Sequence, residues 1–247
     1  MKKILAIILA LSLALSLALC AAAETEETAV MTYEEFAAAE IGDEVTVETY
    51  VQAKQGWWTD SETGVSQASF YTQAEDGAYF LYNLPCTEEE YAQLVPGTKI
   101  KVTGEKAQWP EAVGEIEIIN ATFEIEEGEY IAEATDVTAL FGTEELIAEM
   151  NKFVAIKGAT VAAANDEGAA FLYNWDGSGE DGSDLYFNVT IGEGTYTFTV
   201  ESYLCGAGTE VYEAVKALNV GDVIDLEGFL YWYESAQPHI TSVTAAE

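Results

Sequence analysis

Aromatic side chains are the residues of this sequence whose types and positions best suit ligand binding. Trp57 and Trp58 are adjacent within the otherwise polar range 55–67, and Trp109 directly precedes a proline. Such rings can stack on a sugar ring, a heterocycle or a peptide, or they can fill the end of a barrel or an interface. The aromatic residues that we consider as candidates for ligand binding are Trp57, Trp58, Trp109, Trp175, Phe229, Tyr231 and Tyr233.

An acidic loop over residues 174–184 is a candidate metal site. Its side chains offer several oxygen ligands at loop spacing, which suits a hard cation such as Ca²⁺. The loop departs from an EF-hand counted from Asp176, because position six is Asp181 and position twelve is Phe187. A solvated turn is the competing interpretation, and calcium is the only cofactor that the sequence suggests. The candidate ligands are Asp176, Ser178, Glu180, Asp181 and Asp184.

No set of residues in the sequence predicts catalysis. His239 is the single histidine, so a His-based zinc site or a Ser-His-Asp triad is not expected. Without arginine there is no bidentate anion clamp, and no glycine-rich phosphate loop follows a strand. Carboxylates are too abundant to single out a catalytic pair. We therefore expect a binding protein and not an enzyme.

The charge balance is strongly acidic, with 9 basic residues against 44 acidic ones and a formal net charge of −35. Nucleic acids and anionic membranes are bound by clustered Lys and Arg, and here repulsion dominates. The sequence therefore predicts no nucleic-acid partner. The content of 49% hydrophobic and 12% aromatic residues is nevertheless ample for a folded core.

Residues 1–23 have the pattern of an export signal. Lys2 and Lys3 precede an apolar run from residue 4 to 19, and small residues at 21–23 offer a cleavage site. The run is shorter than the roughly 20 residues of a transmembrane helix. Cys20 suggests a lipid anchor, although Leu19 is larger than the residue usual before a lipidated cysteine. We expect an exported protein, secreted or attached to the cell surface, with residues 24–30 as a short acidic tether.

An internal duplication organises the rest of the chain. Two glycines seven residues apart enclose an alternating strand at 97–104 and again at 221–228. Each pair follows a cysteine (Cys86 and Cys205) and an acidic-apolar helical segment, and Ile118 matches Ile240 downstream. Two cysteines could form one disulfide or remain free thiols, and the sequence does not decide between these alternatives.

Each copy has the pattern strand, strand, strand, helix, strand, strand. Alternating valines, an Asp-Gly turn and a Thr-x-x-Glu capping box indicate these elements in the first copy. The expected strands are 45–51, 69–73, 78–83, 99–108 and 115–125, and then 153–161, 185–191, 196–202, 223–233 and 239–245, with helices at 87–94 and 209–218. Further short helices are expected at 32–39 and 143–150.

This order is that of the five-stranded OB-fold barrel. On the segments 33–36, 50–55, 97–104, 171–179, 198–205 and 228–233, the sequence resembles a family of exported tandem OB-fold-like proteins of Gram-positive bacteria. The resemblance implies an all-β protein with short helices, built as two tandem five-stranded barrels over residues 31–128 and 129–247. It implies no catalytic residues.

We expect the two barrels to pack together. The connection around residues 126–134 has no Pro or Ser run and carries Tyr130 and Ile131, which gain by burial. Phe229, Tyr231 and Tyr233 alternate on the outer face of a predicted strand, where a monomer rarely leaves such a patch bare. Either the neighbouring barrel or a partner covers them.

From these patterns we expect an extracellular or cell-surface binding protein that uses aromatic loops for a neutral or cationic ligand, such as a carbohydrate, another small molecule or a protein. The alternative is a structural or interaction subunit of a cell-envelope assembly, with the aromatic strand as its contact surface.

Overall fold

The computed structural model describes residues 29–246. The expected export signal and Cys20 lie outside the described residues. Within residues 29–246, no helix is long and apolar enough to cross a membrane.

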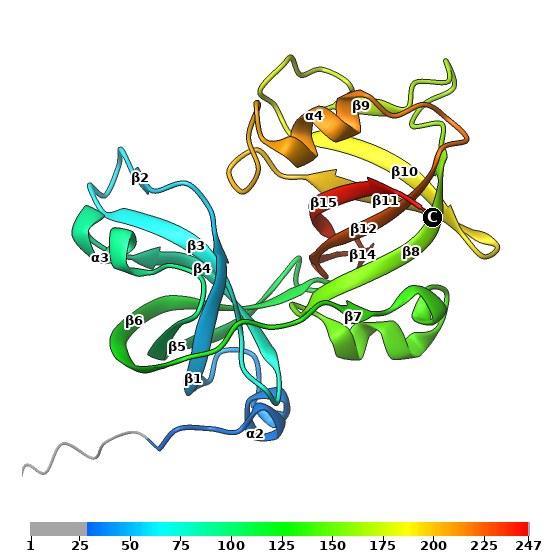
Figure 1. Cartoon of the computed structure of the whole chain (residues 1–247). Helices are drawn as coiled ribbons and strands as arrows, with labels where there is room; N and C mark the ends of the chain where they lie inside the picture. The colour runs from blue at the N-terminus through cyan, green and yellow to red at the C-terminus, as the bar shows by residue number, and fades with distance from the viewer. Residues whose placement is uncertain (1–28, 247) are drawn as a thin grey trace, which may run out of the picture.

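The first half of the described chain closes into a five-stranded barrel (Figure 1). Its strands follow the order β1-β5-β6-β4-β3, and pairing of β3 with β1 closes the barrel. All pairings are antiparallel except β4 with β6, which is parallel. The elements are α2 (Tyr33–Ala38), β1 (Glu44–Lys54), β2 (Trp58–Thr59), β3 (Ser66–Gln73), β4 (Ala78–Pro85), α3 (Glu88–Gln93), β5 (Thr98–Trp109) and β6 (Glu115–Glu129).

The second half repeats the same barrel. Its order is β8-β12-β15-β11-β10, closed by pairing of β10 with β8, and the parallel pair is β11 with β15. The elements are β7 (Thr135–Asp136), η1 (Thr138–Leu140), η2 (Glu144–Glu149), β8 (Phe153–Ala162), β9 (Phe171–Tyr173), β10 (Leu185–Ile191), β11 (Gly194–Val200), α4 (Glu210–Lys216), β12 (Val223–Phe229), β13 (Trp232–Tyr233), β14 (Ser235–Ala236) and β15 (His239–Ala245). The prediction of two tandem OB-fold-like barrels is confirmed.

Local sequence signals set the bounds of the helices. The side chain of Thr87 accepts a hydrogen bond from the backbone N–H of Glu90, whose carboxylate in turn accepts from the Thr87 N–H. Thr32 and Glu35 cap α2 in the same way, and Thr209 caps α4. Each cap satisfies N–H groups that the first helical turn leaves unpaired. The segment predicted as a helix at 143–150 is a 3₁₀ helix, η2.

The strand predicted over 223–233 is interrupted. β12 ends at Phe229, because the next residue leaves the sheet: Leu230 N–H donates to the carbonyl of Lys152, and the Leu230 carbonyl accepts from Asn151. The chain resumes pairing only in the short hairpin of β13 and β14. The predicted facing is nevertheless correct, since Ile224, Leu226 and Leu230 are buried in the second barrel's core.

Three apolar clusters hold the molecule together. Each barrel has its own core, the first including Val45, Val47 and Val51. A third cluster lies between the barrels, with Tyr71 and Phe80 from the first and Phe229 from the second. Ala53, Phe153, Leu204 and Tyr231 pack against this third cluster.

Hydrogen bonds also cross the junction, which confirms that the two barrels pack together. The N–H of Phe153 donates to Gln73 Oε1 at 2.8 Å, and the N–H of Gly56 donates to the carbonyl of Tyr203 at 2.8 Å. Further crossing contacts join Trp232 to Glu115, Asn151 to Ile116, Glu234 to Val113 and Tyr71 to His239.

Candidate functional site at the barrel junction

A pocket of about 390 Å³ opens where the two barrels meet, within the range of roughly 300–1,000 Å³ typical of small-molecule sites. We call it the junction pocket. Both barrels contribute to it: the loop after β1 and the strand β4 from the first, and the segment after β11, the turn after β12 and β15 from the second. The lining residues are Gln55, Gly56, Trp58, Phe80, Tyr82, Asn83, Glu201, Tyr203, Tyr231 and His239.

Aromatic rings form the walls of the junction pocket, and several have a free face. Trp58 is 40% exposed, Tyr82 46% and Tyr203 68%. Within residues 29–246, Trp58 and Tyr203 make no contact with another aromatic ring, so a planar ligand ring can stack on them without displacing a partner.

His239 is a buried polar residue of this pocket. Its Nδ1 lies 2.7 Å from the hydroxyl of Tyr71, and its ring is stacked on Tyr231, with centroids 4.3 Å apart and planes 18° apart. Burial lowers the pKa of His239 to about 3, so the imidazole is neutral at physiological pH.

Glu201 adds a buried carboxyl to the same pocket. It is 9% exposed; Oε1 accepts a hydrogen bond from the backbone N–H of Tyr203 at 3.2 Å, whereas Oε2 has no hydrogen-bond partner among residues 29–246. Burial, and to a lesser extent the charge of Asp184, raises the pKa of Glu201 to about 7. The carboxyl is therefore partly neutral at physiological pH.

Two amides complete the polar lining. Within the described chain, the side chains of Gln55 and Asn83 make no hydrogen bond, so their donors and acceptors are free for a ligand. Asn83 has a φ of 50°, a left-handed conformation that Asn tolerates better than most residues. The pocket therefore combines stacking surfaces with hydrogen-bonding groups at their edges and has no serine, threonine or cysteine nucleophile in its lining.

The structure brings only part of the predicted aromatic set together. Trp58 and Tyr231 line the junction pocket. Phe229 is 3% exposed and packs between the barrels, as expected from its outward position on the strand. Trp57 packs against the first barrel's core, and its Nε1 donates to the Cys86 carbonyl at 3.0 Å.

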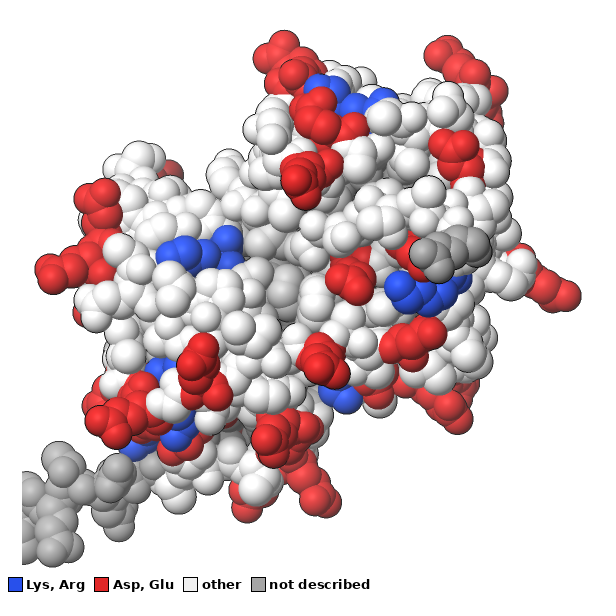
Figure 2. Space-filling view, in the orientation of Figure 1, with Lys and Arg blue, Asp and Glu red and all other residues white. Residues whose placement is uncertain are grey.

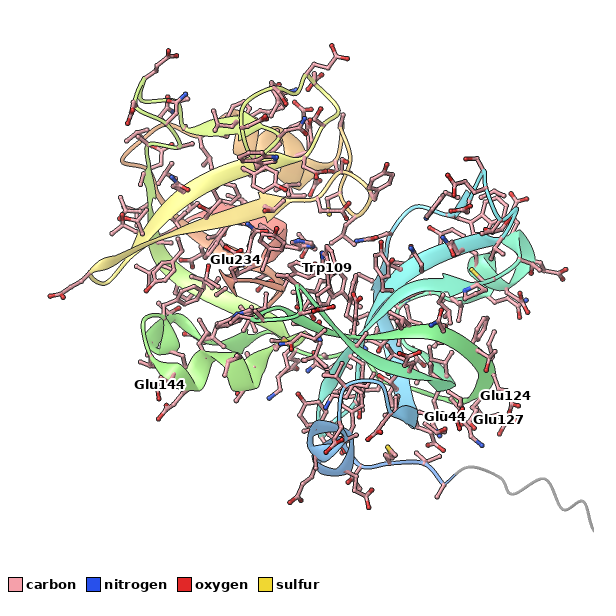
Figure 3. All side chains as sticks on the ribbon, turned by 180° about the vertical axis from the view of Figure 1, so that it is seen from behind. Glu44, Trp109, Glu124, Glu127, Glu144 and Glu234 are labelled. Carbon is pink, nitrogen blue, oxygen red and sulfur yellow. The ribbon has the colours of Figure 1, made fainter. Side chains whose placement is uncertain are left out.

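The other three predicted aromatic residues lie elsewhere. Trp109 is 61% exposed at the end of β5, and Figure 3 places it where the two barrels approach each other. Tyr233, 45% exposed, lies in β13 and forms an isolated bridge with Gly114. Trp175 is 76% exposed in the acidic loop. None of the three lines the junction pocket.

The acidic loop does not gather its carboxylates. Asp181 pairs with Lys216 at 2.9 Å, Asp176 accepts from the N–H of Ser178, and Asp184 accepts from the N–H of Ser202. Glu180 uses its backbone N–H to bond the side chain of Ser183. No group of three or more His, Cys, Asp or Glu side chains in the described part of the chain is placed to hold a metal ion. Calcium binding stays a prediction.

Sequence reasoning missed Tyr82, Asn83, Glu201 and Tyr203. Tyr82 and Asn83 lie in β4 of the first barrel, whereas Glu201 and Tyr203 follow β11 of the second, so only the packing of the two barrels brings these residues together. Glu201 carried no signal, because it is one of 44 acidic residues and only its burial distinguishes it. Cys86 and Cys205 are free thiols and lie outside the lining of this pocket.

Figure 2 shows acidic side chains over both lobes and basic ones in a few small groups, whereas the region between the lobes on this face is mostly uncharged. Several lysines are held in ion pairs, among them Lys99 with Glu48 and Glu126. Among residues 29–246 no lysine lines the junction pocket, so the described lining offers no cationic group for a phosphate.

No protein-family model matches the sequence, and no curated protein matches it. Solved structures are similar to this chain only at low identity and low TM-score. A murine DNA-binding protein bound to double-stranded DNA is 11% identical with a TM-score of 0.37, over 81% of this chain and 99% of that one. A HINa domain in complex with double-stranded DNA is 8% identical with a TM-score of 0.35, over 83% and 100%. A Replication Protein A heterotrimer bound to single-stranded DNA is 12% identical with a TM-score of 0.33, over 83% and 49%.

Two expectations from the sequence are corrected by these matches. The predictions of a neutral or cationic ligand such as a carbohydrate, and of no nucleic-acid partner, are contradicted, since the similar structures are described as DNA complexes. The alternative of an envelope-assembly subunit is withdrawn with them. At these identities and TM-scores the likeness does not identify a ligand.

Proposed function

We propose that the protein is a binding protein whose junction pocket takes an unpaired nucleobase, presented by a free nucleoside or by a single-stranded nucleic acid. A base is a planar ring with two stacking faces and an edge of hydrogen-bond donors and acceptors. The pocket offers the complement of each: free faces on Trp58 and Tyr203, and polar groups on Asn83, Glu201 and His239.

The observation that carries this proposal is the combination of unstacked rings with polar groups that have no partner. A stacking contact with an aromatic side chain contributes about 1–3 kcal/mol per base and tolerates different bases. Side chains of the pocket that make no hydrogen bond with residues 29–246, such as those of Gln55 and Asn83, favour a ligand that brings hydrogen bonds to the site.

The charge of the protein sets how such a ligand binds. A net charge of −35 repels phosphates, and no lysine lines the pocket. Contact with the base must therefore supply the affinity, while phosphates remain at the mouth of the pocket. Salt screens like-charge repulsion over about 8 Å at physiological ionic strength. Binding of an oligonucleotide should thus tighten as salt is added, opposite to the usual counterion-release behaviour.

We also propose that the protein is exported and performs no chemistry on its ligand. The support for export is the pattern of residues 1–23, and the resemblance to exported Gram-positive proteins agrees with it. Intact-mass measurement of the protein recovered from its native cells tests this: a chain beginning near residue 24, or one bearing a lipid on Cys20, supports export. A chain that retains residues 1–23 in the cytosol contradicts it.

Calorimetric titration with the four ribonucleosides tests the binding proposal without phosphate repulsion. A fluorescently labelled single strand of mixed sequence, titrated at low and at moderate salt, tests the polymer as the source of the base. Trp58→Ala and Tyr203→Ala should each weaken binding by roughly fivefold or more, from the loss of one stacking face. Trp175→Ala is the matched control, because this tryptophan is 76% exposed and outside the pocket.

The proposal fails if neither nucleosides nor the single strand bind. It also fails if binding weakens with salt and is unchanged in Trp58→Ala and Tyr203→Ala, because phosphate contacts elsewhere would then account for it.

A further inference from the structure

The hydrogen bond between Tyr71 and His239 determines which group the imidazole presents to the junction pocket. Tyr71 is 0% exposed, and its hydroxyl lies 2.7 Å from Nδ1 of His239. Within residues 29–246 this hydroxyl has no other hydrogen-bond partner. A tyrosine hydroxyl carries one hydrogen, and burying that hydrogen without an acceptor is unfavourable.

The two possible directions of the Tyr71–His239 hydrogen bond therefore differ in free energy. If Nδ1 donated to the hydroxyl oxygen, the Tyr71 hydrogen would be left buried without an acceptor. If the hydroxyl donates to Nδ1, both groups are satisfied. A neutral imidazole has one N–H, so the hydrogen of His239 must then be on Nε2.

The position of Nε2 leaves its hydrogen free to bond a ligand in the junction pocket. His239 lines the junction pocket, and Nε2 makes no hydrogen bond with any described residue. It is also absent from the fully buried polar atoms that lack partners, so it reaches the pocket's open space.

Stacked rings hold this pair in place from both barrels. Phe229 lies on Tyr71 with centroids 4.4 Å apart and planes 11° apart, and Tyr231 lies on His239 at 4.3 Å and 18°. Phe80 contacts both Tyr71 and Tyr231. The donor is therefore fixed in direction before a ligand arrives, which lowers the entropy lost on binding.

We infer that His239 is a specificity-determining residue: Tyr71 holds it in the tautomer with hydrogen on Nε2, and the ligand places a hydrogen-bond acceptor, a carbonyl oxygen or an unprotonated ring nitrogen, against that N–H. The ligand part of this inference rests on the proposed function. The tautomer part is a property of the free protein. Nucleobases with a carbonyl oxygen or ring nitrogen free at the edge fit the donor, and an edge offering only N–H groups does not.

The single histidine makes the tautomer directly measurable. A long-range ¹H–¹⁵N spectrum of the mature protein at neutral pH should show one protonated nitrogen, Nε2, and one unprotonated nitrogen, Nδ1. In Tyr71→Phe the donor to Nδ1 is lost, so the same spectrum should shift toward a mixture of tautomers. A wild-type spectrum with hydrogen on Nδ1 overturns the inference, whatever the protein binds.

The binding part needs a variant that loses the donor without leaving the hydroxyl unpaired. In the double variant Tyr71→Phe/His239→Phe, both polar partners become apolar rings of similar shape, which is often nearly neutral for stability. The folded double variant should bind nucleosides about tenfold more weakly than the wild type, as expected for one lost hydrogen bond of roughly 1.4 kcal/mol. Tyr233→Phe, which changes a hydroxyl outside the junction pocket with no hydrogen-bond partner in the described chain, should bind as the wild type does.

Unchanged nucleoside affinity in the double variant overturns the role of His239 as the donor while leaving the proposed site intact. If neither a nucleoside nor the single strand binds the wild type, the proposed function fails together with the acceptor. The spectrum still decides the tautomer in that case.

Discussion

The rings of Tyr71 in β3 and Phe229 at the end of β12 lie stacked across the two barrels, with centroids 4.4 Å apart. Both side chains are almost completely buried, and Phe153 and Phe80 pack on either side of the pair. This contact is the centre of the third apolar cluster and joins two halves that each have a complete barrel of their own.

Replacement of Phe229 by Ala should destabilise the protein by about 3–5 kcal/mol, since the ring leaves a cavity against Tyr71 that the rigid strands cannot close. Urea unfolding followed by circular dichroism measures this. Val223→Ala, on the same strand but 48% exposed, is the control and should cost well under 1 kcal/mol. Equal losses in the two variants would contradict a central role for the stacked pair.

The two barrels should also unfold together. Separation would expose Tyr71, Phe80 and Phe229 and would leave the crossing hydrogen bonds of Gln73 and Glu115 without their partners. We therefore expect a single calorimetric transition for the whole chain, at a higher temperature than for residues 31–128 or 129–247 alone. Two transitions that match the separate halves would show that the junction contributes little.

Stability should decline as pH rises from about 5 to 7. Burial raises the pKa of Glu117 and of Glu201 to about 7, so the folded state keeps protons that the unfolded chain releases near pH 4.5. Stability from these groups is complete below the unfolded pKa and is lost as pH rises through the folded one, by about 1.4 kcal/mol per group and pH unit.

His239 acts in the opposite direction. Burial lowers its pKa from 6.5 to about 3, so stability is lost as pH falls below the unfolded value. Between pH 5 and 6.5 the buried carboxyls together outweigh the single imidazole, and the melting temperature should be highest near pH 5. In Glu117→Gln/Glu201→Gln the decline toward pH 7 should become shallower. A wild-type melting temperature that rises steadily from pH 5 to 7 would refute the assignment.

Much of the fold could be predicted because it depends on local signals. Alternating Val45, Val47 and Val51 placed a strand with one buried face, and the Thr87–Glu90 capping box placed α3. The duplication then predicted the second barrel from the first. The outward position of Phe229 on an alternating strand also predicted that the neighbouring barrel or a partner packs over it.

The junction pocket could not be predicted in the same way, because it depends on how two complete barrels are oriented. A backbone hydrogen bond joins Gly56 to Tyr203, and no side-chain pattern in the sequence predicts it. The interruption of the strand after Phe229 turns Tyr231 toward His239, and it arises from backbone partners in the segment before β8. Burial of Glu201 among 44 acidic residues likewise appears only in three dimensions.

Glu115 offers a further test of the junction. It is 0% exposed; its Oε2 accepts from the N–H of Trp232 at 2.8 Å, and its Oε1 has no hydrogen-bond partner in the described part of the chain. Burial holds the pKa of Glu115 well above its usual range, so the folded state favours the neutral acid while the unfolded chain ionises near pH 4.5. The wild type therefore loses stability as pH rises above the unfolded value.

Glu115→Gln keeps an oxygen acceptor for Trp232 and removes the titration. Glu115→Gln should be about as stable as the wild type near pH 4.5 and more stable by at least about 1 kcal/mol near pH 8. At pH 8 the folded wild type must either keep a proton that the unfolded chain releases or bury a charged carboxylate, and the variant avoids both costs. Glu115→Ala should be less stable than Glu115→Gln at both pH values, because the Trp232 N–H loses its acceptor at a cost of roughly 1–3 kcal/mol. Urea unfolding of the three proteins at the two pH values measures both differences. If Glu115→Gln were no more stable than the wild type near pH 8, Glu115 would have to be ionised in the folded junction, and its burial would need an unrecognised cationic partner.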